Sequence, residues 1–337
     1  MNTFYQQSLA QQEEQLLRLA YSALPAWGLE GHLSLIKHRE NAVYRLTTPD
    51  NQLYALRIHR ANYHSDTSLN SELSWVNALQ GCGIEVPNAI PTQTGAFFTL
   101  ASLDSIPETR QIDLLSWVDG KQIGSIEDGL SDSPEQIQKN YFIIGQVAAQ
   151  IHNQASQWPT PEGFQRHSWG LEDLVGEEPF WGPFWELQAL SATQRSLILK
   201  ARETVRKGLM TLSTDSADYS MIHADLVPEN VLVNANSVQI IDFDDAGFGW
   251  HLFEIATALY FIQFDQHYEI AKQALIAGYR QHRPLSDEKL AQLPLLMVAR
   301  GFTYLGWVHT RQNTETALES TPHLINLCCQ TINHYLK

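Results

Sequence analysis

The sequence predicts an α+β fold in two parts, and three observations support that prediction. Short segments rich in strand-forming residues dominate the first 118 of the 337 residues. From residue 119 onward, apolar residues recur at helical spacing over most of the chain. The exception is a compact strand-turn-strand segment between residues 220 and 242. We therefore expect an N-terminal lobe over residues 1–118 and a mainly helical C-terminal lobe over residues 119–337 that carries a β-hairpin.

The first lobe is predicted to be an antiparallel sheet with helices. A leading helix covers residues 9–23, with Leu9 and Leu16 on its apolar face, and Pro25 ends it. A second helix has Asp66 as its N-cap and Gly81 as its end. The turn at residues 48–51 holds Pro, Asp and Asn, which favour a tight reversal between two strands. The predicted strands cover residues 33–37, 42–47, 53–59, 96–100 and 111–118.

The second lobe is predicted to begin with a long helix, because apolar residues repeat at helical spacing between Ile137 and Ile151. Residues 158–185 are rich in aromatic residues, Gly and Pro, and we interpret them as a long irregular insertion with a function or a lid role. Tryptophans in and after it are candidates for lining a substrate pocket, although core packing is the more frequent role of each: Trp169, Trp181, Trp185, Trp250 and Trp307.

Composition excludes some classes of function. The net charge of −15 opposes binding to nucleic acid or to an anionic membrane surface and tolerates cationic ligands. No apolar run is long enough to cross a bilayer. The three cysteines fit neither a disulfide framework nor a zinc site, so we expect free thiols in a reducing compartment, the cytoplasm.

The segment from residue 221 to residue 245 holds the candidate chemistry. Two short apolar runs, 231–233 and 238–241, flank a four-residue turn and predict a hairpin. Asp225 and Asn230 enter that hairpin and Asp242 leaves it, so the three side chains should converge. The spacing His-x-Asp-x-x-x-x-Asn, followed by an Asp at a strand end, is typical of phosphoryl transfer. Asp225 is then the catalytic base, while Asn230 and Asp242 hold Mg²⁺ on the nucleotide phosphates. We assign His223 a scaffold role.

A second pattern lies in the first lobe. Arg57 lies on a predicted strand, and Glu72 lies on the apolar face of the helix that follows. Because a buried carboxylate needs a partner, we expect an Arg57–Glu72 ion pair that positions nucleotide phosphates. The loop between the first two strands lacks a Gly-rich signature, but the backbone N–H groups of Glu40, Asn41 and Ala42 offer a phosphate cradle.

These residues resemble the aminoglycoside phosphotransferase family, which includes choline-kinase-like enzymes, homoserine kinases of the second type and a bacterial stress-response protein kinase. The resemblance covers residues 30–310 and rests mainly on the hairpin motif. It implies a two-lobed protein-kinase-like fold that uses ATP and Mg²⁺, with the roles given above for Asp225, Asn230 and Asp242. It also implies a hinge near residues 115–118, where Ser116 and Val118 would contact the nucleotide.

Three positions depart from the family pattern. Arg57 replaces a usual Lys, Ala224 replaces a frequent Gly, and Glu254 replaces a frequent Asp, a change expected to loosen a contact under the catalytic loop. Since none of them removes an essential group, we expect an active enzyme.

The predicted function is ATP- and Mg²⁺-dependent phosphorylation of a hydroxyl on a small molecule. The acceptor would be an amino alcohol, an amino acid or an aminoglycoside-like compound, possibly cationic. Two alternatives stay open at this point: a stress-response-type protein Ser/Thr kinase that acts at the same site, and a nucleotide-binding module without turnover.

Overall fold

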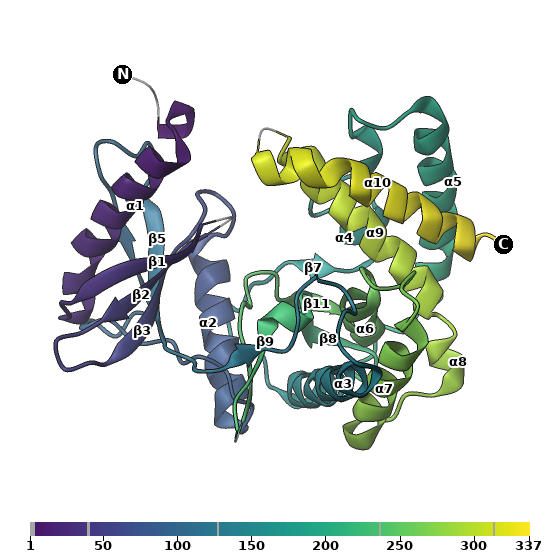
Figure 1. The fold of residues 1–337 in the computed structure, drawn as a ribbon, viewed down its shortest axis with the longest axis horizontal. Helices are drawn as coiled ribbons and strands as arrows, with labels where there is room; N and C mark the ends of the chain where they lie inside the picture. The colour runs from purple at the N-terminus through teal and green to yellow at the C-terminus, as the bar shows by residue number, and fades with distance from the viewer. Residues whose placement is uncertain (1–3, 39–40, 127, 236, 313) are drawn as a thin grey trace. The chain divides into compact units, whose positions relative to one another are not determined.

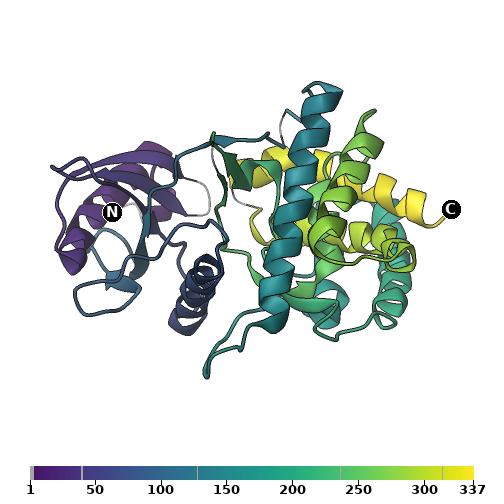
Figure 2. The same cartoon turned by 90° about the horizontal axis from the view of Figure 1, so that it is seen from below.

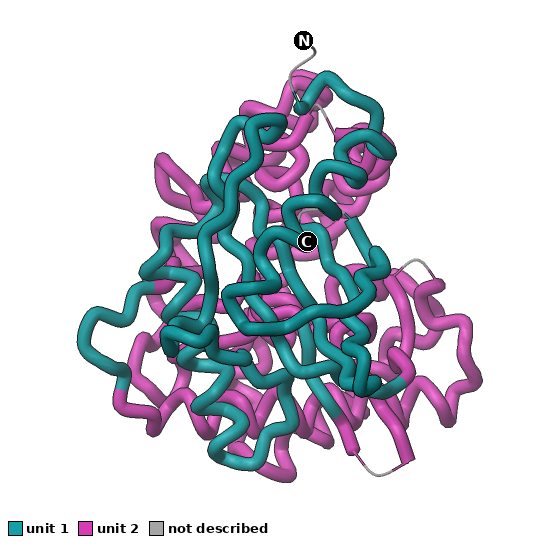
Figure 3. The backbone as a smooth tube through the Cα atoms, turned by 90° about the vertical axis from the view of Figure 1, so that its left-hand side faces the viewer, with its two compact units in different colours: residues 1–120, 160–165, 239–241 teal, residues 121–159, 166–238, 242–337 magenta. Residues whose placement is uncertain are grey.

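A computed structural model shows the fold of the protein and describes residues 4–38, 41–126, 128–235, 237–312 and 314–337. The chain forms two compact units, coloured separately in Figure 3. Unit 1 contains residues 1–120, 160–165 and 239–241, and unit 2 contains the rest. The α+β prediction is confirmed, because an antiparallel sheet dominates unit 1 and helices dominate unit 2 (Figure 1).

Unit 1 is built on a five-stranded antiparallel sheet in the order β1-β2-β3-β5-β4. The predicted ends of four strands are wrong by one or two residues, because hydrogen-bonded pairing and not composition decides where a strand ends. The elements, with two short 3₁₀ helices (η), are η1 Phe4–Gln6, α1 Leu9–Ala23, η2 Leu24–Trp27, β1 His32–His38, β2 Ala42–Thr47, β3 Leu53–Ile58, α2 Asp66–Gly81, β4 Phe98–Ala101 and β5 Arg110–Ser116.

Both helices of unit 1 start at a serine cap. Ser8 and Gln11 form a capping box before α1, and the Ser65 hydroxyl accepts the Ser68 N–H at 3.1 Å before α2. Asp66 was the predicted N-cap of α2, but Ser65 takes that place and Asp66 is the first helical residue. Leu9 was predicted on the apolar face of α1, yet it is exposed, because only the later turns of the helix pack on the sheet.

The two faces of this sheet are covered by different helices. Leu56 and Leu114 pack in the cluster that contains α1, whereas Ala55 and Leu115 pack in the cluster that contains residues of α2. Since side chains alternate along a strand, Arg57 lies on the same face as Ala55, which is the face that α2 covers. Glu72 is a buried residue of α2.

Unit 2 is mainly helical, with short strands at its centre. Its helices are α3 Pro134–Gln157, α4 Leu171–Val175, η3 Phe184–Glu186, α5 Ala192–Leu209, η4 Pro228–Asn230, α6 His251–Leu259, α7 Tyr268–His282, α8 Asp287–Leu290, α9 Leu293–Thr310 and α10 Glu315–Tyr335. Its strands are β6 Lys121–Gln122, β7 Ser168–Trp169, β8 Tyr219–Ile222, β9 Val231–Val233 and β11 Gly247–Trp250, and β10 Val238–Ile240 follows β9.

Close helix packing builds the interior of unit 2. Helices α3 and α7 lie side by side (Figure 2) and approach most closely at Gly145 and Gly278. A Cβ on Gly145 would lie 2.0 Å from the Leu275 carbonyl oxygen, so only glycine permits this crossing. Helix α9 is buried along most of its length and packs against α6 and α10. It is therefore the central helix of the unit.

Two small sheets organise the loops of the candidate site. The predicted hairpin strands β9 and β10 are neighbours in a sheet of order β10-β9-β6. A second sheet has the order β7-β11-β8. The prediction that residues 158–185 form an irregular insertion is wrong in part, since β7, α4 and η3 lie within or at the end of it. These elements are too short for a periodic pattern to reveal. No helix among the described residues is long and apolar enough to cross a membrane.

Candidate active site

The loop between β8 and β9 brings Asp225 and Asn230 together. The Asn230 side-chain amide donates one hydrogen bond to the Asp225 backbone carbonyl at 2.8 Å and another to its Oδ2 at 2.9 Å. The turn of η4, which ends at Asn230, folds the chain back toward Asp225. Asn230 is buried, whereas the Asp225 side chain keeps 30% of its surface exposed. The loop therefore presents one oriented carboxylate.

Asp242 lies two residues beyond the end of β10, is exposed, and has a left-handed backbone (φ 68°). Asp is one of the few non-glycine residues that adopt this conformation as single residues, and strained residues of this kind cluster at functional sites. The convergence of Asp242 with Asp225 and Asn230 stays a prediction. The Asn230 amide nitrogen donates its hydrogen bonds to Asp225, so the side-chain oxygen is the atom that is left to bind a metal ion. An oxygen ligand of this kind fits a hard cation.

The Glu254 carboxylate on α6 accepts hydrogen bonds from the backbone of this loop. Its Oε2 accepts the N–H groups of His223 at 2.6 Å and Ala224 at 3.1 Å, and its Oε1 accepts the Leu226 N–H at 3.4 Å. Glu254 is 1% exposed, so protein groups such as these donors, and not water, compensate its charge. We expected the contact from Glu254 to be loose, and the structure shows instead three hydrogen bonds.

Buried histidines surround Glu254. Burial alone would raise the pKa of Glu254, but His152, His223 and the Ala224 N–H lower that pKa below its usual value and keep the carboxylate ionised. Burial lowers the pKa of His152, whose ring stacks on the ring of His251 with centroids 4.3 Å apart. His152 is thus the buried ring next to the carboxylate, with its Nε2 at 3.9 Å from Glu254 Oε2, and His251 packs against that ring.

His223 and Ala224 hold the shape of the loop before Asp225. The His223 Nδ1 accepts the Asp225 backbone N–H at 3.2 Å, in line with the predicted scaffold role. Ala224 is fully buried and has φ 63°, a conformation that glycine adopts more easily. The departure at Ala224 therefore has a structural cost, since this loop holds a residue with a side chain in a left-handed conformation.

The segment after Asp242 is held by Arg166 and His167, which the sequence did not single out, and by Trp169, which was predicted only as a candidate for the substrate pocket. Arg166 donates to the carbonyls of Asp244 and Ala246, each at 2.6 Å. The Trp169 indole donates to the Asp245 carbonyl at 2.9 Å, and the His167 ring lies 3.0 Å from the same oxygen. Because the donors come from the predicted insertion, part of that insertion has a structural role: it fixes the backbone that follows Asp242.

A buried cation lies behind Asp225. The Arg300 Nη2 on α9 is 3.5 Å from Asp225 Oδ1 and donates to the Tyr304 hydroxyl at 2.8 Å. Burial alone would lower the pKa of Arg300, but Tyr304 and Asp225 raise it above its usual value, so the guanidinium is charged. Arg300 was not among the predicted site residues. The signal that points to it is a single cation within the apolar run of α9.

The tryptophans proposed for the acceptor pocket mostly face the protein's own arginines. Trp169 and Trp181 lie beside the Arg300 guanidinium, Trp185 beside Arg202 and Trp307 beside Arg311. These contacts support packing as the role of the four rings.

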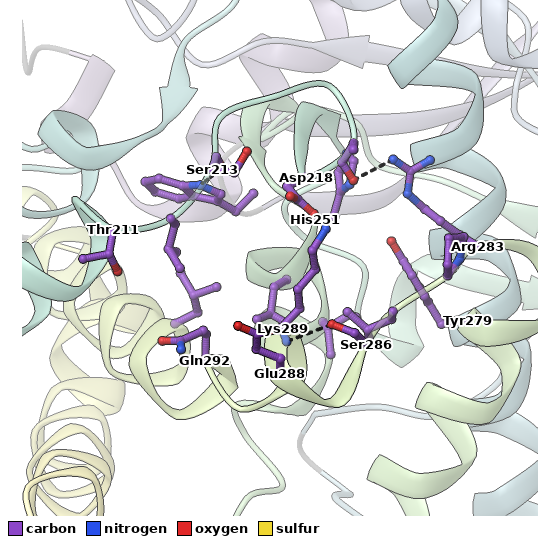
Figure 4. A pocket seen from close by; sticks show the side chains of 18 residues that line it. Thr211, Ser213, Asp218, His251, Tyr279, Arg283, Ser286, Glu288, Lys289 and Gln292 are labelled. Carbon is purple, nitrogen blue, oxygen red and sulfur yellow. Dashed lines mark hydrogen bonds and ion pairs between the residues drawn. The ribbon is translucent and has the colours of Figure 1, made fainter.

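Trp250 lines a cavity of about 300 Å³ in unit 2, shown in Figure 4. Asp218 and Lys289 form an ion pair of 2.5 Å at its wall, and His251 borders it from the start of α6. Asp225, Asn230 and Asp242 are not among the lining residues, so this cavity is separate from the candidate catalytic loop.

A buried charge cluster lies in unit 1. The Arg57 Nη2 is 3.0 Å from Glu72 Oε1, so the predicted ion pair is present. The same guanidinium also forms two hydrogen bonds to Asp113 on β5, at 2.9 and 2.5 Å, and His59 Nε2 lies 3.0 Å from Asp113. Asp113 was missed, although an Asp between Ile112 and Leu114 in a strand is an uncommon residue that needs a partner.

Asp113→Asn is expected to destabilise the protein. Burial alone would raise the pKa of Asp113, but Arg57 and His59 lower it from 3.8 to about 2. Such a depressed pKa stabilises the folded state above pH 3.8, and the contribution is lost as the pH falls through about 2. The variant should lose about 2 kcal/mol in urea unfolding at pH 7 and depend less on pH in the acid range. Equal stability of Asp113→Asn and the exposed control Asp104→Asn would contradict this.

The other predicted nucleotide contacts of unit 1 lie at the ends of strands. Asn41 precedes β2 and its Oδ1 accepts the Arg60 N–H at 2.9 Å, while Ala42 is buried at the start of β2. Ser116 ends β5 and exchanges hydrogen bonds with the backbone of Asn88 at 2.8 Å. Val118 follows β5, and Glu40 lies outside the described residues. Their nucleotide contacts stay predictions.

Comparisons with known proteins show the family of the chain. The chain matches the APH phosphotransferase enzyme family over residues 32–285. It is 28% identical over 290 residues to a homoserine kinase of Rhizobium etli, covering 84% of this chain and 77% of that protein. It is 21% identical over 296 residues to the amicoumacin kinase of Bacillus subtilis, covering 85% and 82%.

Solved structures support the same assignment. A microcompartment-associated aminopropanol kinase is 26% identical, with a TM-score of 0.83 over 95% of this chain and 97% of that one. An amicoumacin kinase in complex with AMP-PNP, Ca²⁺ and Ami has a TM-score of 0.71 at 18% identity, covering 96% of this chain and 94% of that one, and shows a common fold. The family match spans most of the chain, and the resemblance inferred from the hairpin motif is confirmed. The chain therefore belongs to the APH phosphotransferase enzyme family, and it is a kinase.

Proposed function

We propose that the protein transfers the γ-phosphoryl group of ATP, with Mg²⁺, to a hydroxyl group of a small amino alcohol or amino acid. The observation that carries this proposal is the Asp225 carboxylate, which two side chains orient and which remains partly exposed. A carboxylate held in this way is suited to accept a proton from a hydroxyl group that approaches its open side.

In the proposed reaction, Asp225 binds and orients the acceptor hydroxyl. The hydroxyl oxygen forms a bond to the γ-phosphorus as the bond from phosphorus to the β,γ-bridging oxygen breaks, and Asp225 takes the hydroxyl proton. ADP and a phosphate ester are the products. Glu254 keeps the backbone beneath Asp225 fixed, so the carboxylate does not need to reorganise during the step.

Asn230 and Asp242 are the residues that would hold Mg²⁺, through a carboxamide oxygen and a carboxylate. When bound, the ion supplies positive charge to the phosphate oxygens. The complex of a structurally similar amicoumacin kinase with AMP-PNP and Ca²⁺ supports the use of a nucleotide and a divalent cation. In unit 1, the proposed nucleotide contacts are Arg57, Asn41, Ala42, Ser116 and Val118, with Glu72 positioning Arg57.

The class of acceptor is proposed from the relatives. The names of the similar proteins give aminopropanol, homoserine and amicoumacin as their substrates. Each of the first two is a small compound with an amino group and a hydroxyl group, and the acidic character of this chain suits a cationic acceptor of that kind.

Asp242→Asn is expected to weaken metal-dependent nucleotide binding, because an amide is a poorer ligand for Mg²⁺ than a carboxylate. Isothermal titration should show the Kd for ATP in excess Mg²⁺ rising by about tenfold or more, with little change in EDTA. The matched control is Asp287→Asn, an exposed residue at the start of α8. A Kd equal to that of the unchanged protein in excess Mg²⁺ would refute the metal assignment.

The proposed function is tested by ADP release from Mg²⁺-ATP across a panel of amino alcohols and hydroxy amino acids. Asp225→Asn serves as the inactive control. We expect release that depends on at least one acceptor and that disappears in the variant. Labelling of a protein substrate without turnover of any small molecule would favour the protein-kinase alternative. Stabilisation by ATP with no release at all would favour a non-catalytic module.

A further inference from the structure

We propose that Arg300 is a positioning residue, which locks the plane of the Asp225 carboxylate so that one side of it faces the acceptor hydroxyl. This inference rests on the proposed function, because it concerns the geometry of the proposed base. It adds a residue of α9 to the site, 75 positions away from Asp225 in the sequence.

The two oxygens of Asp225 are held by different partners. Asn230 donates to Oδ2 at 2.9 Å, and the Arg300 Nη2 faces Oδ1 at 3.5 Å. A carboxylate held at both oxygens cannot rotate about its terminal bond without losing one of the two contacts. Since the Arg300 contact is long, it orients Asp225 without forming the short bidentate pair that would occupy the carboxylate.

The burial of Arg300 shows why it acts through Asp225 and not on the substrate. Its side chain has no exposed surface, whereas Asp225 has 30% of its side chain exposed. An acceptor that enters from solvent therefore meets Asp225 first and has the guanidinium behind it. Arg300 is thus a positioning residue and not a catalytic one.

Aromatic rings hold the guanidinium in place. The central guanidinium carbon lies 4.4 Å from the ring centre of Tyr304, 5.5 Å from Trp181 and 5.6 Å from Phe253, with Trp169 at 5.9 Å. Within the described part of the chain, its Nε and Nη1 have no hydrogen-bond partner, although both are buried. Cation–π contacts with these rings therefore stabilise the part of the guanidinium that has no hydrogen-bond acceptor.

The energetic cost of this arrangement indicates a function. Taking a cation out of water costs several kcal/mol, and replacing a buried ion pair with apolar residues of similar size is often neutral or stabilising. An apolar residue at position 300 would fill the space between the rings without that cost. Asp245 also interacts electrostatically with Arg300, but the carboxylate that the guanidinium contacts is Asp225. This buried cation is therefore more readily explained by what it does to the Asp225 carboxylate than by stability.

The test compares three variants by steady-state kinetics with the acceptor identified in the ADP-release panel. Arg300→Met removes the charge and keeps most of the volume, Arg300→Lys keeps the charge, and Tyr304→Phe removes only the hydroxyl that holds Nη2. For Arg300→Met we expect kcat to fall by about 10²-fold, with KM for ATP and for the acceptor nearly unchanged. Arg300→Lys should recover part of kcat, and Tyr304→Phe should lose less than Arg300→Met.

A double-mutant cycle separates positioning from general structural damage. If Arg300 acts through Asp225, adding Arg300→Met to Asp225→Asn should cost almost no further activity. Additive losses, or a kcat of Arg300→Met equal to that of the unchanged protein, would overturn the inference while leaving the proposed function intact. An unchanged protein that turns over no acceptor would overturn both. If Arg300→Met fails to fold, the kinetics of Tyr304→Phe and its cycle with Asp225→Asn decide the question in the same way.

Discussion

Asp225→Asn is expected to lower kcat by roughly 10²–10⁴-fold, which is the range for loss of a general base. The amide has nearly the same shape as the carboxylate, and its oxygen can still accept a hydrogen bond from Asn230 or face Arg300. What the amide lacks is the ability to take up the hydroxyl proton. The defect should therefore appear in the chemical step, and the Kd for Mg²⁺-ATP should stay within about twofold of its original value.

Single-turnover measurements with saturating ATP and acceptor distinguish the chemical step from binding. The matched control is Asp215→Asn, which makes the same chemical change at an exposed position in the same unit. Its kcat should equal that of the unchanged protein. If Asp225→Asn retained more than about a tenth of the original rate, Asp225 would not be the base.

Contacts between residues close in sequence could be predicted. Asp225 and Asn230 are five residues apart on one loop, so a chain reversal suffices to join them, and the structure shows two hydrogen bonds between them. The Arg57–Glu72 pair could also be predicted, because a strand and the helix that follows it usually pack together. In both cases the local sequence is enough to predict which two side chains meet.

Contacts between residues far apart in sequence could not be predicted. Asp113 pairs with Arg57 because β3 and β5 are neighbours in a register that places the two residues opposite each other. Nothing in the local sequence of either strand specifies that register. Arg300 reaches Asp225 only because α9 packs as the central helix of unit 2. A lone charge in an apolar segment signals that a partner exists, but it does not identify that partner.

The predicted insertion illustrates a different limit. Residues 158–185 contain elements of two to five residues, which are shorter than the period that sequence patterns need. Their role depends on hydrogen bonds from Arg166 and Trp169 to backbone carbonyls of another loop. Because a carbonyl oxygen is present in every residue, no residue type in the accepting loop reveals such a contact.

Glu254→Ala is expected to be the most destabilising single change in unit 2 among those considered. It removes the acceptor for three backbone N–H groups, and each buried group left without a partner costs about 1–3 kcal/mol. Allowing for partial relaxation and entry of water, the free energy of unfolding should fall by at least about 3 kcal/mol. Urea unfolding at neutral pH measures this, with Glu288→Ala on the exposed helix α8 as the control.

The same substitution should also reduce turnover, since the His223, Ala224 and Leu226 N–H groups belong to the loop that positions Asp225. Because the pKa of Glu254 lies below its usual value in the folded protein, its stabilising effect should be complete at neutral pH and decline only in acid. Glu254→Asp is the informative intermediate: its side chain is one methylene shorter, so the carboxylate should not reach all three donors. A stability of Glu254→Ala within about 0.5 kcal/mol of the control would show that the loop holds its shape without this carboxylate.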